Sequence, residues 1–234
     1  MIRQNLTLDD FNEALTQLDT LLDRTGFDDS ISIRAIGGFA MQIHGLRKTG
    51  VTADIDTVTA SYPPAVQKCI GIIAEEMSLP PDWINNDSVF TLEDEVTDED
   101  VKAFDSMLDA AFIDLPKKYK HINISVASVE TLIKSKVYAT CDIGQGRTTK
   151  DLDDLLALLA QRGITTRQEL EAAYPWIDDL EFDNCNRLLK SSLATTNVAE
   201  TNPAILEETQ NAENVLDERG VIDQRLSEME IDDR

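Results

Sequence analysis

Apolar residues near the start of the chain recur at helical spacing and predict a first helix over residues 8–22. The apolar positions are Leu8, Phe11, Leu15, Leu18, Leu21 and Leu22. Residues three and four apart share one face of a helix, and Thr7 is of the type that caps a helix start. We expect this helix to pack its apolar face on a sheet.

The next segment, residues 31–36, alternates apolar and polar side chains, which is the pattern of a half-buried strand. Gly37–Gly38 follows at once, and glycine lets the backbone turn tightly. Residues 39–45 then have the pattern of a short helix. The order strand, tight turn, helix is therefore expected over residues 31–45.

A second β-rich run covers residues 51–60 and carries Asp54 and Asp56. Side chains alternate along a strand, so residues two apart leave the same face and the two carboxylates are expected close together. Like charges in such a position repel each other unless a cation lies between them. The pair is therefore a candidate metal site.

The rest of the chain predicts further elements of both kinds. Helices are expected over residues 63–77, 101–108, 129–141, 148–162, 165–173 and 175–189. Residues 82–128 are expected to supply further strands, among them residues 122–127, with Trp83, Phe90 and Phe112 as core anchors. Beyond residue 191 the content of Thr, Asn, Glu and Pro rises, which predicts a flexible acidic tail with a short helix near residues 211–229.

The chemistry that suits the block from Ile36 to Asp56 is nucleotidyl transfer. Mg²⁺ is a hard cation that binds one or two carboxylates together with substrate phosphate oxygens, and a Gly-Gly backbone lets phosphates approach closely. Taken singly, an Asp-x-Asp pair occurs by chance in an acidic chain and Gly-Gly is an ordinary turn. Their order along the chain favours the functional interpretation over the structural one.

This block resembles the opening motif of minimal nucleotidyltransferases of the polymerase-beta superfamily, in particular the abortive-infection type toxins of bacterial toxin–antitoxin pairs. The matching residues are Gly37-Gly38-Phe39-Ala40, His44-Gly45-Leu46-Arg47 and Thr52-Ala53-Asp54-Ile55-Asp56. The resemblance implies an α+β fold, in which a polymerase-beta-like core with a small mixed sheet flanked by helices carries a C-terminal helical extension. It also implies Mg²⁺, or Mn²⁺ in its place, held by Asp54 and Asp56.

The resemblance continues downstream to about residue 160. In the family a strand leads into a helix with an inward lysine, then into a loop with an arginine and a helix bearing aspartates. The corresponding residues here are Lys136 and Ala139, followed by Arg147, Lys150, Asp151 and Asp154. The resemblance thus implies catalytic roles for Asp54, Asp56, Lys136 and Asp151, and nucleotide binding by Gly37, Gly38, Arg47, Thr52 and Arg147.

Two features depart from the family pattern. The spacing from Arg47 to Thr52 is slightly longer than usual, and the strand over residues 121–126 carries no acid where many polymerase-like enzymes have a third carboxylate. Either the site works with two aspartates, a lysine and a downstream aspartate, or the chain is inactive. We favour the first alternative.

The helical face separates the two candidate lysines, because Lys136 shares the more buried side with Leu132 and Ile133 whereas Lys134 falls between faces. Without the resemblance, Lys136 is equally well a surface lysine whose stem packs on apolar neighbours. Asp151 and Asp154 are expected at the edges of the leucine stripe of the next helix. One of these two aspartates is expected to orient Lys136 through a salt bridge or to act as a general base. Asp151 is the first choice for this role and Asp154 the second. Acids in a first helical turn also need no functional explanation.

The amino-acid composition indicates which other sites and which cell compartment to expect. The 234 residues contain Cys69, Cys141 and Cys185, which predict reduced thiols, and the histidines His44 and His121, too few for a histidine metal site. His44 is expected to face the nucleotide or to make a local hydrogen bond. No apolar run reaches membrane-spanning length and no secretory leader is seen, so we expect a cytoplasmic protein.

Charge argues against broad nucleic-acid binding, since the formal net charge is −23. Residues 196–234 hold eleven acidic and three basic residues, and this tail either covers the cleft, binds a partner or keeps the chain soluble. The basic residues in or near the motifs are Arg34, Arg47, Lys48, Lys134, Lys136, Arg147 and Lys150. A positive cleft on a negative protein is therefore expected.

The prediction is an enzyme that transfers a nucleoside monophosphate from a nucleoside triphosphate to an acceptor hydroxyl on RNA, tRNA in particular, or on protein, with an antitoxin protein as a further partner. The alternative is a catalytically silent module of the same fold that binds proteins. A catalytic core is expected over residues 1–145, a helical subdomain that completes the site over 146–192, and the acidic tail over 193–234.

Overall fold

The computed structural model describes residues 2–47, 50–89, 95–141, 150–176 and 193. The chain divides into two compact units, and the division falls between Thr131 and Leu132. The expected helix over residues 175–189 lies almost wholly outside the described residues, as does the acidic tail. Phe90, Lys48 and Arg147 also lie outside them.

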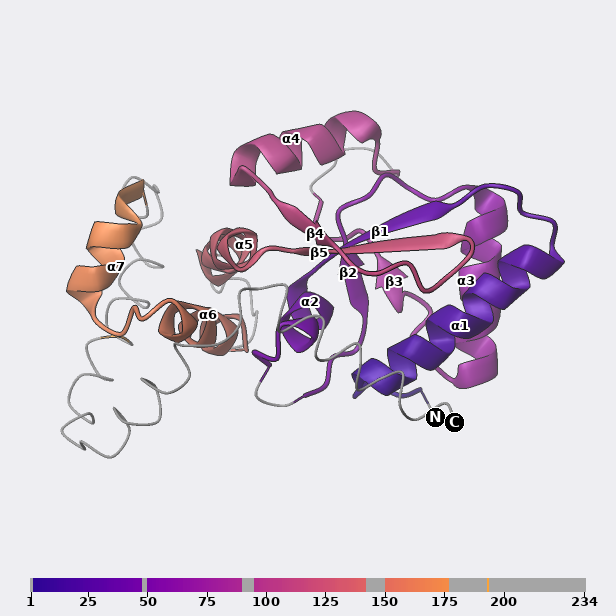
Figure 1. Ribbon diagram of the computed structural model, residues 1–234, viewed down its shortest axis with the longest axis horizontal. Helices are drawn as coiled ribbons and strands as arrows, with labels where there is room; N and C mark the ends of the chain where they lie inside the picture. Colours follow the sequence, from indigo (N-terminus) through magenta and orange to yellow (C-terminus); the bar gives the residue numbers. More distant parts are fainter. Residues whose placement is uncertain (1, 48–49, 90–94, 142–149, 177–192, 194–234) are drawn as a thin grey trace. The chain divides into compact units, whose positions relative to one another are not determined.

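The first unit is built on a five-stranded sheet with the strand order β3-β2-β1-β5-β4 (Figure 1). The strands are β1 (Ile31–Ile36), β2 (Ile55–Thr57), β3 (Ile84–Asn85), β4 (Phe112–Asp114) and β5 (Ile122–Ala127). The central strand β1 is parallel to β5 and antiparallel to β2, so the sheet is mixed. A small mixed sheet with helices beside it confirms the α+β prediction at this level.

Helices accompany the sheet and continue into the second unit. They are α1 (Leu8–Arg24), α2 (Gly37–Ile43), α3 (Pro64–Met77), α4 (Asp98–Leu108), α5 (Val129–Cys141), α6 (Lys150–Gln161) and α7 (Arg167–Ala173). Among the described residues, no helix is long and apolar enough to cross a membrane.

The helix starts follow from local side-chain chemistry. Thr7 caps α1 through a capping box, in which its hydroxyl accepts from the Asp10 backbone N–H and the Asp10 carboxylate accepts from the Thr7 backbone N–H. Thr97 and Asp100 form the same box at α4, which therefore begins at Asp98, three residues before the predicted start. Asp98, Glu99 and Asp100 lie in the first turn of α4, where their negative charges complement the helix dipole.

The alternation of β1 gives the sheet two different faces. Ile31, Ile33 and Ala35 are buried on one of them. Phe11 of α1 and Phe39 of α2 meet edge to face with ring centroids 5.3 Å apart, so the two helices pack together. On the other face Arg34 donates to Asp105 of α4 at 2.8 Å, and in Figure 1 α4 lies on the opposite side of the sheet from α1 and α2.

Two expected features of the core came out differently. Strand β2 spans only Ile55–Thr57, so it is shorter than the β-rich run over residues 51–60. Phe112, expected as a core anchor, is only half-buried, because β4 is an edge strand, and the Arg34 guanidinium lies 4.1 Å above its ring. Trp83 is fully buried as expected, and its indole donates to the Ile70 carbonyl at 3.1 Å.

Candidate functional site

Strand pairing brings the Gly-Gly turn against the second aspartate. Ile36, the last residue of β1, is the register partner of Asp56 in β2, so Gly37 leaves the strand directly beside Asp56. Gly37 has a φ of 65°, and a Cβ atom added to it would lie 2.3 Å from Asp56 Oδ2. Glycine is needed here both for the backbone conformation and for the space that the carboxylate occupies.

Gly38 approaches two further predicted residues. A Cβ atom at Gly38 would lie 2.2 Å from Arg47 Nη1 and 2.3 Å from Thr52 Oγ1. Five residues predicted from the sequence are therefore brought together by this turn: Gly37, Gly38, Arg47, Thr52 and Asp56. Gly37 and Gly38 form the first turn of α2 rather than a separate turn before it.

The segment that carries Arg47 and Thr52 is anchored by backbone hydrogen bonds. Thr52 and Leu6 exchange two of them, at 2.7 and 3.0 Å. The Gln42 side chain of α2 donates to the carbonyls of Leu6, at 3.0 Å, and Gly50, at 2.7 Å. These contacts hold Thr52 in a buried position beside Gly38, where Arg47 is buried as well.

Asp54 directly precedes β2 and Asp56 lies within it, separated by the fully buried Ile55. The backbone N–H of Ile55 donates to the Trp83 carbonyl at 2.7 Å, so the strand that carries the carboxylates is fixed on both sides. Both aspartates are half-exposed. Asp56 lies directly against the Gly37 backbone, and two half-exposed carboxylates two residues apart suit a cation that also binds a substrate.

The donor set is small. Within the described ranges, no group of three or more His, Cys, Asp or Glu side chains is placed to hold a metal ion. A cation at Asp54 and Asp56 would therefore complete its coordination with substrate oxygens and water, which is a common arrangement for Mg²⁺.

Asn85 is a neighbour of this site that the sequence interpretation missed. Strand β3 pairs in parallel with β2, and Asn85 is the register partner of Asp56. Adjacent residues in register point to the same face of a sheet, so the Asn85 amide lies on the carboxylate side of the strand. Strand β3 has only two residues and so shows no periodicity by which to predict it.

The predicted lysine belongs to the second unit, where it forms a three-residue ion cluster. Lys136 Nζ lies 2.6 Å from Asp151 Oδ1 and 3.0 Å from Asp154 Oδ2. The side chains of Lys136 and Asp154 are 8% and 9% exposed, and that of Asp151 is 21% exposed. Charges this well buried are stable only when paired, so each member holds the others in place.

This cluster confirms part of the sequence interpretation and corrects another part. Lys136 is buried and Lys134 half-exposed, as the helical face predicted. Of the two roles considered for Asp151, the salt bridge to Lys136 is present. Asp154 was expected at the edge of the leucine stripe, but it lies on the buried face of α6 with Leu155, Leu158 and Leu159. It is thus as much a partner of Lys136 as Asp151 is.

Two basic residues near the motifs have structural partners. His44 ends α2 and is buried, and its Nε2 lies 2.8 Å from the carbonyl of Ala127 at the end of β5. This hydrogen bond links α2 to a distant strand, so it is not the local one expected. Arg34 pairs with Asp105 and stacks on Phe112, which leaves it poorly suited to phosphate binding.

Cys69 is the one cysteine whose side chain lies within the described part of the chain. It is a free, buried thiol on α3, whereas Cys185 and the side chain of Cys141 lie outside that part. No protein-family model matches the chain, and no curated protein or solved structure does either. The functional assignment therefore rests on the residues and geometry described above.

Proposed function

We propose that the chain is a Mg²⁺-dependent nucleotidyltransferase that moves a nucleoside monophosphate from a nucleoside triphosphate to an acceptor hydroxyl. The α–β phosphoanhydride bond breaks, a phosphodiester bond forms and pyrophosphate leaves. One observation carries the proposal. The Gly37–Gly38 backbone packs directly against Asp56, Arg47 and Thr52, which are the residues that the family resemblance selects from separate parts of the sequence. An ordinary turn would not require that particular set to meet.

Each residue of the turn has a definite task in this proposal. Asp54 and Asp56 would hold Mg²⁺, which when bound neutralises triphosphate charge and orients the reacting phosphate. The resemblance implies that Gly37 and Gly38 admit the phosphates, and their lack of side chains lets Asp56, Arg47 and Thr52 lie against the backbone of the turn. Arg47 offers a planar guanidinium that suits phosphate oxygens. Thr52 supports the same turn through its hydroxyl.

Lys136 enters the proposal through the resemblance and through its own ion cluster. Two carboxylates fix the position of the Lys136 ammonium group. The resemblance implies that this group stabilises charge that develops on a phosphate. Two roles were considered for Asp151, orientation of Lys136 and general base. The 2.6 Å distance between Lys136 Nζ and Asp151 Oδ1 favours the first role. Arg147, outside the described residues, stays a predicted nucleotide ligand.

The acceptor in this proposal is an RNA, tRNA in particular, or a protein, and the enzyme acts as a cytoplasmic toxin with a protein antitoxin as partner. The net charge of −23 disfavours nonspecific binding of long nucleic acids. An acceptor hydroxyl would therefore be selected by local contacts rather than by the overall charge of the protein.

A second candidate function is a silent module that binds proteins. It is favoured by the donor set, since the described residues supply no third carboxylate beside Asp54 and Asp56. In this alternative the acidic surface binds a partner protein, and the turn around Gly37 contributes to the fold without catalysing a reaction.

Labelling distinguishes the two candidates. Each α-labelled triphosphate is incubated with the protein, Mg²⁺ and total cellular RNA and protein, and the labelled fraction is identified. Asp54→Asn and Asp56→Asn should abolish transfer, whereas Asp114→Asn, an exposed carboxylate on β4 of the same sheet, should not. Titration calorimetry with Mg²⁺ and each triphosphate provides the second measurement. A well-folded Asp54→Asn protein with full transfer activity, or a wild type that binds no triphosphate, would exclude the enzyme.

A further inference from the structure

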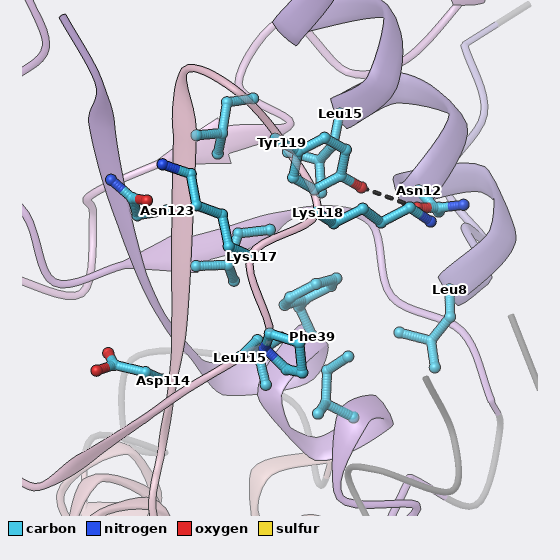
Figure 2. A pocket seen from close by; sticks show the side chains of 14 residues that line it. Leu8, Asn12, Leu15, Phe39, Asp114, Leu115, Lys117, Lys118, Tyr119 and Asn123 are labelled. Carbon is cyan, nitrogen blue, oxygen red and sulfur yellow. Dashed lines mark hydrogen bonds between the residues drawn. The ribbon is translucent and has the colours of Figure 1, made fainter. Parts of the chain in front are cut away.

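A separate pocket of about 300 Å³ lies in the first unit, bounded by α1, α2, β5 and the chain that connects β4 to β5 (Figure 2). Its volume is at the small end of the range of ligand pockets, which is roughly 300–1,000 Å³. It contains none of the residues assigned to nucleotidyl transfer. The pocket therefore calls for an explanation of its own.

The interior of the pocket is apolar. Its walls are formed by Leu8 and Leu15 of α1, Phe39 and Ile43 of α2, and Ile122 and Ile124 of β5. Phe39, Ile43, Leu15 and Ile122 are buried, so the walls are part of the packed core and not loose surface side chains. Such a lining binds hydrocarbon by removing it from water.

Charged groups stand around the mouth. Lys117 and Lys118 are exposed and line the pocket together with the exposed Asp114, so these three groups contribute a net charge of +1. This local sign is opposite to the net charge of −23 for the whole chain. A positive mouth on a strongly acidic protein selects for anions.

The mouth is also held in shape by hydrogen bonds. Burial raises the pKa of Tyr119 to about 12, so its hydroxyl stays protonated and donates to Asn12 Oδ1 at 2.8 Å, which Figure 2 shows as a dashed line. Lys118 Nζ donates to the same oxygen. The Asp19 carboxylate of α1 accepts from the backbone N–H groups of Lys120, at 3.1 Å, and His121, at 2.6 Å. The connection is thereby fastened to α1, and the pocket is largely preformed.

We propose that this pocket binds a small monoanionic amphiphile, namely a carboxylate with a short hydrocarbon chain. The hydrocarbon fills the space between α1, α2 and β5, and the carboxylate lies at the mouth near Lys117 and Lys118. Asp114 disfavours phosphates and other multiply charged groups, because it would repel a second negative charge. The volume is too small for a helix or a strand of a partner protein, which selects a small molecule.

Decanoate is a suitable probe, and its affinity for the full-length protein is measured by titration calorimetry. Decanol and decylammonium have the same hydrocarbon chain with a neutral or a positive head group. We expect decanoate to bind, decanol to bind more weakly and decylammonium to bind most weakly. Equal affinity for all three would overturn the assignment of an anionic ligand. The absence of decanoate binding up to about 1 mM, the weak end of specific affinities, would overturn the pocket itself.

Two variants locate the binding. Leu8→Trp places a larger side chain at the pocket wall near the surface and should abolish decanoate binding. Lys117→Glu replaces an exposed positive charge at the mouth by a negative one and leaves the core unchanged. It should weaken decanoate binding roughly fivefold, because an exposed charge contributes little to affinity. Lys102→Glu makes the same charge change on α4 and should leave the affinity unchanged, since its side chain is 74% exposed and lies outside the pocket lining. If Lys117→Glu and Lys102→Glu behave alike, or Leu8→Trp binds normally, decanoate does not occupy this pocket.

Discussion

Asp56 Oδ2 lies 2.3 Å from the point that a Cβ atom on Gly37 would occupy. Because of this contact, the Gly37→Ala substitution should lower the free energy of unfolding in two separate ways. The left-handed backbone costs about 1–2 kcal/mol for a residue with a Cβ atom. Displacement of the Asp56 side chain costs about a further 1–3 kcal/mol, as for other overpacked positions. Both lower the free energy of unfolding, which chemical denaturation measures.

Gly26→Ala is the matched control for this prediction. Gly26 also has a positive φ, of 74°, but no atom lies within 4 Å of its added Cβ. It should therefore show the backbone cost alone. Equal losses in the two variants would mean that Asp56 does not pack against Gly37.

Gly38→Ala should also destabilise the protein, by about 1–3 kcal/mol, because the new methyl group would overlap Arg47 Nη1 and Thr52 Oγ1. Gly71→Ala, within α3, should have the opposite sign. No atom lies within 4 Å of the Cβ added there, and alanine in a helix is more stable than glycine by about 0.5–1 kcal/mol. Thermal unfolding of the two variants gives the comparison. A stabilised Gly38→Ala protein would be incompatible with the packing described for this turn.

Lys136→Met should destabilise the second unit by about 3–5 kcal/mol, because it leaves Asp151 and Asp154 buried without their cation. Lys134→Met, on the same helix but half-exposed, should change stability by no more than about 0.5 kcal/mol. Combining Lys136→Met with Asp151→Asn and Asp154→Asn should recover part of the loss, since no unpaired charge then remains. Urea titrations of the single and combined variants test this, and additive losses would exclude the ion cluster.

Stability should depend on pH through His121. Its Nδ1 lies 2.9 Å from the Asp29 carbonyl and its Nε2 lies 3.2 Å from Asp23 Oδ1, and these hydrogen bonds raise the pKa of His121. A raised pKa in the folded state stabilises the fold fully below about pH 6.5, the usual histidine pKa, and the contribution disappears as the pH rises through the higher folded value.

Unfolding midpoints of the wild type and His121→Gln between pH 5.5 and 8.5 measure this contribution. The difference between the two proteins should be largest at the acidic end of this range and shrink as the pH rises. In an NMR titration, the histidine signal that is missing from His121→Gln should titrate above pH 6.5 in the wild type. A signal that titrates below that value would contradict the predicted direction.

Sequence patterns predicted the elements that repeat regularly and are capped locally. Helix α1 was predicted from its apolar spacing and Thr7, and β1 from the alternation of its first five residues. The burial of Lys136 was predictable because helical periodicity distinguishes it from Lys134, whereas its pairing with Asp151 was one of two roles left open for that carboxylate. In each case the information lies within a single helix or a single strand.

The features that were missed depend on residues far apart in the chain. Asn85 lies beside Asp56 only because a two-residue strand pairs with β2, and no local pattern encodes that register. Asp154 is buried because of how α6 packs, which shifted its apolar face by about one position from the leucine stripe. The pocket joins Leu8 to Ile124, and such a junction follows from tertiary packing alone.

The parallel ladder between β1 and β5 also sets the order in which the protein can fold. Ile31 pairs with Ile122, 91 positions later in the chain, so the central strand lacks its parallel partner until β5 has been synthesised. Loops this long close slowly, and topologies dominated by such distant pairings refold in milliseconds to seconds rather than microseconds. During that interval the apolar face of β1 is exposed, which makes nascent chains of this protein candidates for chaperone binding.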